Sequence, residues 1–320
     1  MKLLVTGGLG FIGSNFINYW ISNHPDDDVI NVDKVTYAAN FDNISKPDYK
    51  NYMFVKSDIN DKNIMKDLIS SSDIVINFAA ESHVDNSIAS PEGFLKSNYM
   101  GVFNILELVR KYDKRFHQVS TDEVYGSLSL HSPNRFDENS CYNPRNPYSS
   151  TKAAADLLIR SYFNTYGIKA TISNCSNNFG PNQHPEKLIP KIILNAILNL
   201  KIPIYGNGSQ VRDWIYVDDH CRALDLIIHK GRMGETYLIS SESEMSNIDL
   251  ANKILSILDR RGNLIEYVPD RLGHDKRYSL SPLKIQQELG WYSSINFEAA
   301  LRKTIKHYQE NLNKYTTINH

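Results

Sequence analysis

The chain has 320 residues, of which 41% are hydrophobic and 22% charged, as expected for a globular protein with a full-sized core. Lysine and arginine total 35 and aspartate and glutamate total 36, so charge gives no reason to expect nucleic acid or an anionic membrane as a partner. The first apolar run meets glycines after three residues, too early for a signal peptide or a membrane span. We therefore expect a small-molecule substrate.

The three cysteines, Cys141, Cys175 and Cys221, lack the paired spacing of a zinc knuckle or a disulfide framework. This pattern predicts reduced thiols, a cytoplasmic protein and no metal site.

Strand-like and helix-like segments alternate along the first half of the chain, which predicts a Rossmann-type, doubly wound parallel sheet. The expected strands are Lys2–Thr6, Val29–Val32, Asn51–Lys56, Asp73–Phe78 and Phe116–Ser120, and the expected helices are Phe11–Ser22, Ile64–Ser70, Pro91–Lys111 and Pro147–Tyr166. Beyond about residue 175 prolines interrupt the pattern. We therefore predict a first domain over residues 1–175, to which later strands can return, and a smaller substrate-binding domain over 176–320.

The segment from Thr6 to Gly13 reads TGGLGFIG and places glycines where the first strand turns into a helix. Without Cβ atoms, the backbone can approach a pyrophosphate, and the helix N-terminus offers it free N–H groups. A simple structural turn is the alternative for this motif alone.

Asp33 strengthens the dinucleotide reading because it lies twenty residues after Gly13, at the end of the second predicted strand. A carboxylate there can accept hydrogen bonds from the ribose hydroxyls and would repel a 2′-phosphate, which favours NAD over NADP. Lys34, beside it, argues the other way. Asp58 and Ile59, after the third strand, are expected near the adenine, although an ordinary turn would also explain them.

Tyr148 and Lys152 are four residues apart in a predicted helix that starts after Pro147, so they share one face. A free phenol is a poor base at neutral pH, and a nearby ammonium together with an oxidised nicotinamide would lower its pKa. This pairing is common by chance, but after a dinucleotide fingerprint it indicates an oxidoreductase-type site.

Together, the glycine motif, Asp33 and the Tyr148/Lys152 pair resemble the extended short-chain dehydrogenase/reductase superfamily. Within it, Ser120–Gly126 (STDEVYG) resembles the Thr-Asp-Glu signature of the dTDP-glucose 4,6-dehydratases. The likeness covers nearly the whole chain, through 79–85, 174–178, 185–190, 212–217 and 270–274. Asn86, where the family often has Arg, and Leu272, where it usually has Pro, are local departures.

The resemblance implies a nucleotide-sugar substrate, tightly held NAD and a homodimer formed through the two long helices. It also implies that Asp122 is the acid and Glu123 the base of an elimination, with Thr121 at the C4 oxygen. The chemistry supports such a pair independently: removing water across C5 and C6 needs both roles, and two adjacent carboxyls resist ionising together. A solvated acidic turn is the plain alternative.

The predicted cofactor site comprises Gly7, Gly10, Phe11, Ile12, Gly13, Asp33, Lys34, Thr36, Asp58, Ile59, Ala79, Ala80, Ser82, Ser97, Tyr148, Lys152 and Asn178. The predicted substrate site comprises Ser82, His83, Thr121, Asn177, Lys187, Leu188, Pro203, Tyr205, Arg212, Asn247, Arg271 and His274. Arg212 suits a phosphate clamp because its planar fork can bind two oxygens.

Two alternatives stay open at this stage. One is a UDP-glucose 4,6-dehydratase or another sugar-nucleotide epimerase or dehydratase of the same superfamily; Asp122 argues against an epimerase but does not separate dTDP from UDP. The other is a non-catalytic NAD sensor, which the presence of both Tyr148 and Lys152 disfavours.

Overall fold

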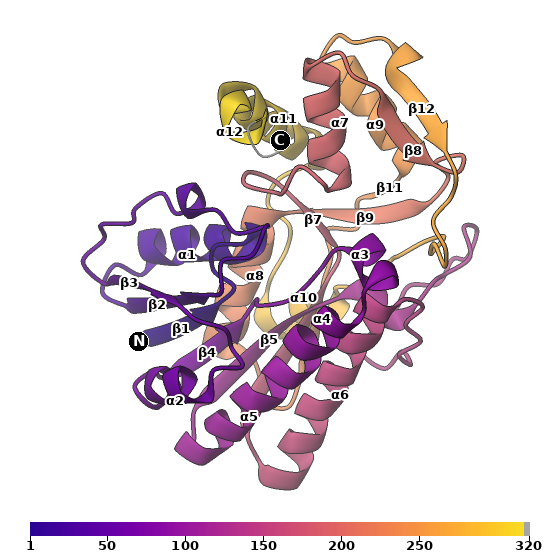
Figure 1. Ribbon diagram of the computed structural model, residues 1–320. Coiled ribbons are helices and arrows are strands. Elements are labelled where there is room, and N and C mark those ends of the chain that lie inside the picture. Colours follow the sequence, from indigo (N-terminus) through magenta and orange to yellow (C-terminus); the bar gives the residue numbers. More distant parts are fainter. Residues whose placement is uncertain (317–320) are drawn as a thin grey trace.

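A seven-stranded parallel sheet organises the larger part of the molecule in the computed structural model, which describes residues 1–316 (Figure 1). Its strand order is β10-β6-β5-β4-β1-β2-β3, and every neighbouring pair is parallel. The strands are β1 (Lys2–Thr6), β2 (Asp28–Asp33), β3 (Tyr52–Lys56), β4 (Ile74–Asn77), β5 (Arg115–Thr121), β6 (Lys169–Cys175) and β10 (Thr236–Ile239). The predicted Rossmann-type fold is confirmed.

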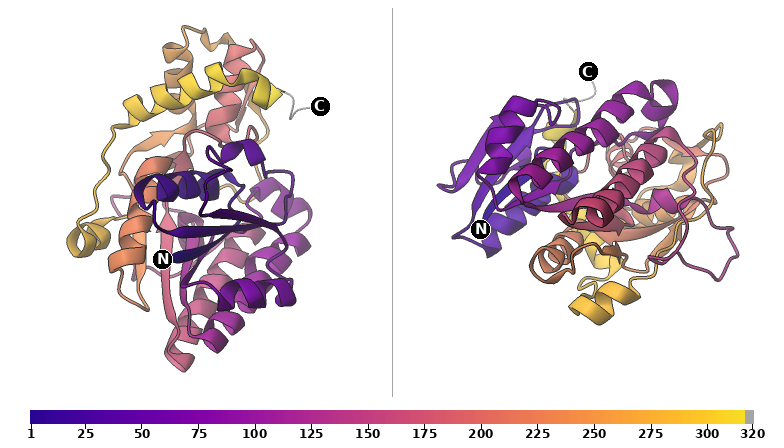
Figure 2. Two further views of the ribbon diagram at one scale, coloured as in Figure 1. Left: turned by 90° about the vertical axis from the view of Figure 1, so that its left-hand side faces the viewer. Right: turned by 90° about the horizontal axis from the view of Figure 1, so that it is seen from below.

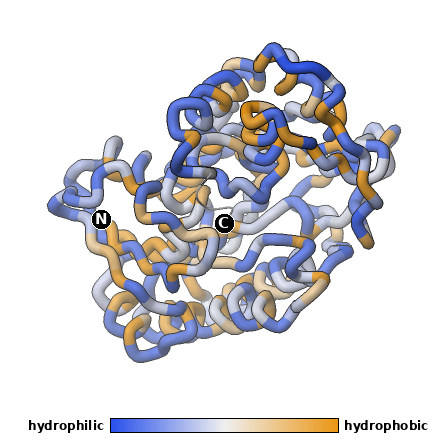
Figure 3. The backbone as a smooth tube through the Cα atoms, turned by 45° about the horizontal axis from the view of Figure 1, so that its top comes forward, coloured by the Kyte–Doolittle hydropathy of each residue, from blue (hydrophilic) through white to orange (hydrophobic). Residues whose placement is uncertain are grey.

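Helices cover both faces of this sheet because its strands are apolar on both sides. Leu3 and Val5 of β1 pack on one face against α1 (Phe11–Asn23), α8 (Val217–Lys230) and α10 (Leu283–Leu289). Leu4 packs on the other face against α2 (Lys62–Ser70), α5 (Gly101–Tyr112) and α6 (Pro147–Tyr166). Figure 2 shows α5 and α6 side by side, and Figure 3 shows hydrophobic stretches alternating with hydrophilic ones along the chain.

The predicted helix over Pro91–Lys111 is wrong in one respect, because it is not continuous α-helix. After α3 (Val84–Ala89), the chain forms α4 (Glu92–Phe94), a π-helical segment η2 (Leu95–Met100) and then α5. Gly101 follows the wide turn, where a Cβ would lie 2.3 Å from the Ile59 side chain. The π-helical turn brings Gly101 close to Ile59 in the loop after β3. The same turn carries Ser97, which lines the pocket described below.

The smaller region consists of a three-stranded sheet in the order β11-β9-β7 and a two-stranded sheet of β12 and β8. Its strands are β7 (Asn177–Phe179), β8 (Ile202–Tyr205), β9 (Val211–Tyr216), β11 (Glu244–Ser246) and β12 (Ile265–Val268). Its helices are α7 (Leu188–Ile197), α9 (Asn247–Ile257), α11 (Phe297–Glu310) and α12 (Leu312–Thr316), and most of them share a separate apolar core.

The predicted division at residue 175 stays a prediction, and the last four residues of 176–320 lie outside the described part of the chain. The segment assigned to the second domain supplies β10 to the large sheet and α8 to one of its faces. Among residues 1–316, no helix combines the length and hydrophobicity needed to cross a membrane.

Candidate active site

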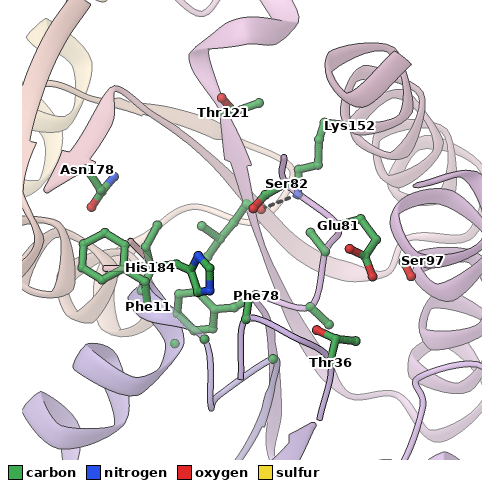
Figure 4. A pocket seen from close by; sticks show the side chains of 18 of the residues that line it. Phe11, Thr36, Phe78, Glu81, Ser82, Ser97, Thr121, Lys152, Asn178 and His184 are labelled. Atoms are coloured by element: carbon green, nitrogen blue, oxygen red, sulfur yellow. Dashed lines mark hydrogen bonds between the residues drawn. The ribbon is translucent and has the colours of Figure 1, made fainter. Parts of the chain in front are cut away.

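One pocket lies at the carboxyl ends of β1, β2, β4 and β5, where open parallel sheets bind ligands (Figure 4). All residues predicted for the cofactor line this pocket, from the glycine turn to Asp33, the 79–82 segment, Ser97, Tyr148, Lys152 and Asn178. Segments far apart in the sequence therefore meet at one cavity, as the motif analysis predicted.

The turn between β1 and α1 is packed so closely that only glycine fits at two of its positions. Without side chains there, the backbone of the turn stays accessible to a bound diphosphate. A Cβ at Gly7, whose φ is +70°, would lie 2.6 Å from the Ala79 nitrogen, and one at Gly13 would lie 2.5 Å from the Gly7 oxygen. No side chain caps α1, whose N-cap is Gly10, and no acidic residue occupies its first turn. Its N–H groups and partial positive charge therefore suit an anion.

Asp33 is buried at the end of β2, where its carboxylate accepts hydrogen bonds from the backbone N–H groups of Leu9 (3.1 Å) and Val35 (2.8 Å). Burial raises the pKa of Asp33, and the two N–H donors oppose that shift. Lys34 points to Ser97 Oγ (3.0 Å) and Glu81 (3.3 Å). Glu81 thus partly neutralises the charge of Lys34. The Asp33 carboxylate remains at the position expected for the ribose.

Tyr148 and Lys152 both face the pocket from the first turns of α6, which begins at Pro147 behind an Asn146 capping box. The Lys152 ammonium donates to the Val119 carbonyl (2.8 Å; Figure 4), and burial lowers its pKa. Burial and the Glu123 charge raise the pKa of Tyr148 well above its ordinary value. This direction is opposite to the one expected with an oxidised nicotinamide nearby, because burial dominates in the protein alone.

Asp122 and Glu123 follow β5 directly, in the short helix η3 (Asp122–Tyr125), and both line the pocket. Burial and the Glu123 charge raise the pKa of Asp122 well above its ordinary range, although Arg212 opposes this. One oxygen of Asp122 is 3.2 Å from Thr121 Oγ1, and the other is buried with no hydrogen-bond partner among the described residues. Burial without a partner favours the neutral form of this carboxyl.

Glu123 differs from its neighbour because it is partly open to the pocket and has more compensating groups. Asn146 Nδ2 donates to its carboxylate (3.3 Å), and the charges of Arg212 and Lys187 further oppose the rise in its pKa that burial causes. Of the two carboxyls, Glu123 is therefore the one that ionises more readily.

The predicted substrate residues divide into two groups. Ser82, Thr121, Asn177 and Lys187 line the pocket, and Lys187 Nζ donates to the Ser82 carbonyl (2.9 Å). The others lie outside its lining: His83 caps α3, Leu188 and Asn247 begin α7 and α9, Pro203 and Tyr205 lie on β8, Arg212 lies on β9, and Arg271 and His274 lie in the loop after β12.

Three of the residues outside the pocket lining contact one another, namely Tyr205, Arg271 and His274. They can therefore contribute to one binding site. The Arg271 guanidinium lies 5.1 Å from the centre of the Tyr205 ring, and the His274 ring centre is 6.1 Å from it. Arg271 also pairs with Asp85 (2.6 Å) and His274 with Asp270 (2.7 Å). These carboxylates hold the cluster in place.

Arg212 is buried on β9 of the smaller region. Its guanidinium donates to the backbone oxygens of Val211 (2.8 Å) and Asp275 (3.0 Å) and stacks 4.2 Å from the centre of the Tyr278 ring. In this arrangement, its positive charge acts on Asp122 and Glu123.

Several residues of the pocket were not predicted from the sequence, among them Glu81, Gln183, His184 and Glu186. Glu81 lies within the recognised 79–85 segment, so its position was available from that motif. The other three come from the loop between β7 and α7, where no local pattern marks the residues that turn inwards.

A glycine turn on a Rossmann-type sheet, Asp33 at the ribose position and Tyr148 with Lys152 in one pocket define an extended short-chain dehydrogenase/reductase. Residues 4–304 match the family model described as GDP-mannose 4,6 dehydratase. The chain is 47% identical to the dTDP-glucose 4,6-dehydratase of Mycobacterium tuberculosis over 97% of its own length and 94% of the relative's. The chain belongs to the dTDP-glucose 4,6-dehydratase family.

Solved structures agree with this assignment. The structure of DesIV (dTDP-glucose 4,6-dehydratase) from Streptomyces venezuelae with NAD and TYD bound matches with a TM-score of 0.96 and 40% identity, covering 99% of this chain and 100% of that one. A UDP-glucose 4-epimerase from Thermotoga maritima, with UDP-glucose, matches with a TM-score of 0.90 and 28% identity, covering 98% and 100%. The shared fold thus extends to the epimerases, while sequence identity is higher with the dehydratases.

Proposed function

We propose that this chain is an NAD-dependent hydro-lyase that converts dTDP-glucose to dTDP-4-keto-6-deoxyglucose and water. The observation that carries the proposal is the pair of buried Asp122 and half-buried Glu123 beside Tyr148 in the pocket, since an oxidation alone needs no such pair. Full-length similarity to dTDP-glucose 4,6-dehydratases supports the same substrate.

NAD fits the pocket because the glycine turn offers a cradle for its pyrophosphate and Asp33 offers an acceptor for its ribose. The chemistry supplied by bound NAD is hydride acceptance from C4 of the sugar and hydride return to C6, so that NAD is regenerated in each turnover. Asn178 and Lys152, which both line the pocket, would hold the nicotinamide end of NAD.

The chain's own residues move the protons. Tyr148 accepts the proton of the C4 hydroxyl, with Thr121 holding the C4 oxygen, and the resulting 4-keto group acidifies the C5 proton. Glu123 then removes that proton, and Asp122 donates its proton to the departing C6 hydroxyl, which leaves as water. When the hydride returns to C6, C5 takes up a proton that comes from solvent, which completes the 6-deoxy sugar. The resemblance implies this division of roles, and the surroundings support it, because Asp122 has a buried carboxylate oxygen without a partner whereas Asn146 donates to Glu123.

The sugar nucleotide would extend from these groups towards Lys187 and Asn177 and then to the cluster of Tyr205, Arg271 and His274. Arg271 and Lys187 supply positive charge for the diphosphate. For Arg212 we propose a dual task, in which one edge faces the diphosphate while its charge keeps Glu123 ionisable.

We also propose that the protein is a cytoplasmic homodimer formed through the α5–α6 face. Three large apolar side chains on its helical segments, Leu95, Met100 and Leu157, are 45–54% exposed. Exposed apolar side chains that lie on one face are typical of a surface that binds another protein chain. The three cysteines are free thiols, consistent with a reducing compartment.

The test is to incubate the protein with dTDP-glucose in deuterated water. The expected product is lighter than the substrate by one water, apart from the isotopic label, and carries one solvent deuterium at C5, with no net consumption of NAD. Glu123→Gln should slow elimination by roughly 10²–10⁴-fold, whereas the exposed Glu92→Gln serves as a matched control and should not. Interconversion of glucose and galactose nucleotides without water loss would refute the dehydratase assignment, and faster turnover of UDP-glucose would correct the nucleotide.

A further inference from the structure

A cluster of His24, Asp225 and His229 lies on the α1–α8 side of the sheet, outside the pocket. His24 follows the last residue of α1, whereas Asp225 and His229 are one turn apart on α8. His24 Nε2 is 3.1 Å from one oxygen of Asp225, and His229 Nδ1 is 2.8 Å from the other. Two imidazole nitrogens thus converge on one carboxylate from two different helices.

Neighbouring aromatic residues hold this cluster in position. The Tyr19 hydroxyl donates to Asp225 Oδ2 (2.9 Å). The buried Trp20 ring packs against both histidines, with its centre 4.2 Å from the His24 ring and 5.5 Å from the His229 ring, and the two imidazole rings themselves stack 5.2 Å apart. The donor atoms therefore sit on a rigid support, and Asp225 has an outer partner of the kind that orients metal ligands.

The spacing of the donor atoms suits a small divalent ion. Tetrahedral zinc with ligands at 2.0–2.1 Å separates neighbouring ligand atoms by about 3.4 Å, and the three donors already lie within 4.8 Å of one another. The side chains of His24, Asp225 and His229 are 25%, 17% and 39% exposed, so an ion and a water as fourth ligand can reach them.

The surrounding charges also favour a cation. The turn that follows His24 carries an acidic run, Asp26 to Asp28, of which Asp27 is paired with the N-terminal ammonium group. The nearby Arg222, which would repel a cation, is paired with Asp219 at 2.6 Å. His229 Nδ1 also lies 3.0 Å from the Asp225 backbone oxygen, so a bound metal ion would take the place of the proton in that hydrogen bond.

We propose that His24, Asp225 and His229 form a binding site for a divalent transition-metal ion, with Zn²⁺ as the preferred occupant. The ion would join α1 to α8 and so tie the N-terminal strand–helix unit to a helix formed 200 residues later. Because α1 begins at the glycine turn and its 13 residues span about 20 Å, the site is remote from the reacting groups. Its effect is on stability rather than on the chemistry.

The test uses the tag-free, NAD-loaded protein, first treated with a chelator and then titrated with Zn²⁺ in a calorimeter. We expect one zinc per chain and a higher melting temperature in its presence. His24→Ala and His229→Ala should each weaken Zn²⁺ binding by at least about tenfold, since loss of an outer partner alone costs 10–100-fold. His131→Ala, which removes an exposed histidine elsewhere, is the matched control and should bind as the wild type does.

A spectroscopic readout locates the ion without relying on affinity alone. Co²⁺ bound between the two histidines should quench the fluorescence of Trp20, and Trp20→Phe should abolish that quenching while Co²⁺ still binds. Zinc binding that is equally tight in the His24→Ala and His229→Ala variants, or the absence of zinc-dependent stabilisation in the wild type, would overturn the proposal. Should an alanine variant fail to fold, Asp225→Asn takes its place. Weaker Zn²⁺ binding by Asp225→Asn and quenching of Trp20 by Co²⁺ in the wild type support the proposal, and the absence of both overturns it.

Discussion

Replacing Gly13 by alanine isolates the contribution of the glycine turn to cofactor binding. A Cβ at this position would lie 2.5 Å from the Gly7 oxygen, about 0.9 Å short of the 3.4 Å at which ordinary contacts begin, and 2.9 Å from the Gly8 Cα. Both obstacles are backbone atoms, so the turn itself must shift. Overpacking of this kind costs roughly 1–3 kcal/mol, against a gain of up to about 1 kcal/mol in helix propensity.

If NAD needs the present position of the turn, it must restore the strained arrangement on binding. We therefore expect the dissociation constant for NAD to rise roughly tenfold to hundredfold in Gly13→Ala, because each tenfold corresponds to about 1.4 kcal/mol. The assay is equilibrium titration of cofactor-stripped protein with NAD. Gly10→Ala is the control, since its Cβ would have a single close contact, 3.3 Å from the Gly7 oxygen.

A Gly13→Ala protein that binds NAD as tightly as the wild type, while remaining folded, would refute the reasoning. Equal losses in the two variants would also refute it, because they would point to a general effect of substitution in the turn rather than to the Gly7 contact.

Two further predictions concern titrating groups. Tyr148→Phe keeps the edge-on ring contact with Phe94 but removes the phenolic oxygen, so oxidation at C4 should slow by several powers of ten, about 1.4 kcal/mol of barrier for each; near-normal turnover would place the base elsewhere. Burial raises the pKa of Asp213 from 3.8 to about 6, so its contribution to stability is full below pH 4 and is lost as pH rises through 6. In Asp213→Asn the free energy of unfolding should therefore fall less between pH 4 and 6 than in the wild type. Urea titrations at several pH values measure this, and an equal fall in both proteins would contradict the reasoning.

Local patterns explain why so much of the pocket could be predicted from the sequence. The glycine turn and the pair Tyr148 and Lys152 each depend on a spacing of a few residues, and a parallel sheet brings the ends of its strands together. Asp33 ends β2 and Asp122 follows β5 directly, so their position follows from the strand assignment. For these residues, the fold class and the local spacing together locate the side chain.

Other features depend on tertiary contacts that no local spacing encodes. His184 and Glu186 reach the pocket from an irregular loop, and His24 meets Asp225 across 201 residues. The π-helical turn near Ser97 arises where Ile59 packs against Gly101, and helix propensity alone predicts an uninterrupted helix. The direction of the Tyr148 pKa depends on burial, which a sequence pattern does not measure.

The position of β10 in the large sheet has a consequence for how the chain folds during synthesis. Until residues 236–239 have left the ribosome, β6 has one open edge, with the unpaired N–H and C=O groups of Ile172 to Cys175 exposed. A growing chain of the first 175 residues thus has an unpaired edge strand, which can pair with another chain, until some sixty more residues have been added. We expect fragments that end before β10 to aggregate, and chaperone dependence to be concentrated in that interval of translation.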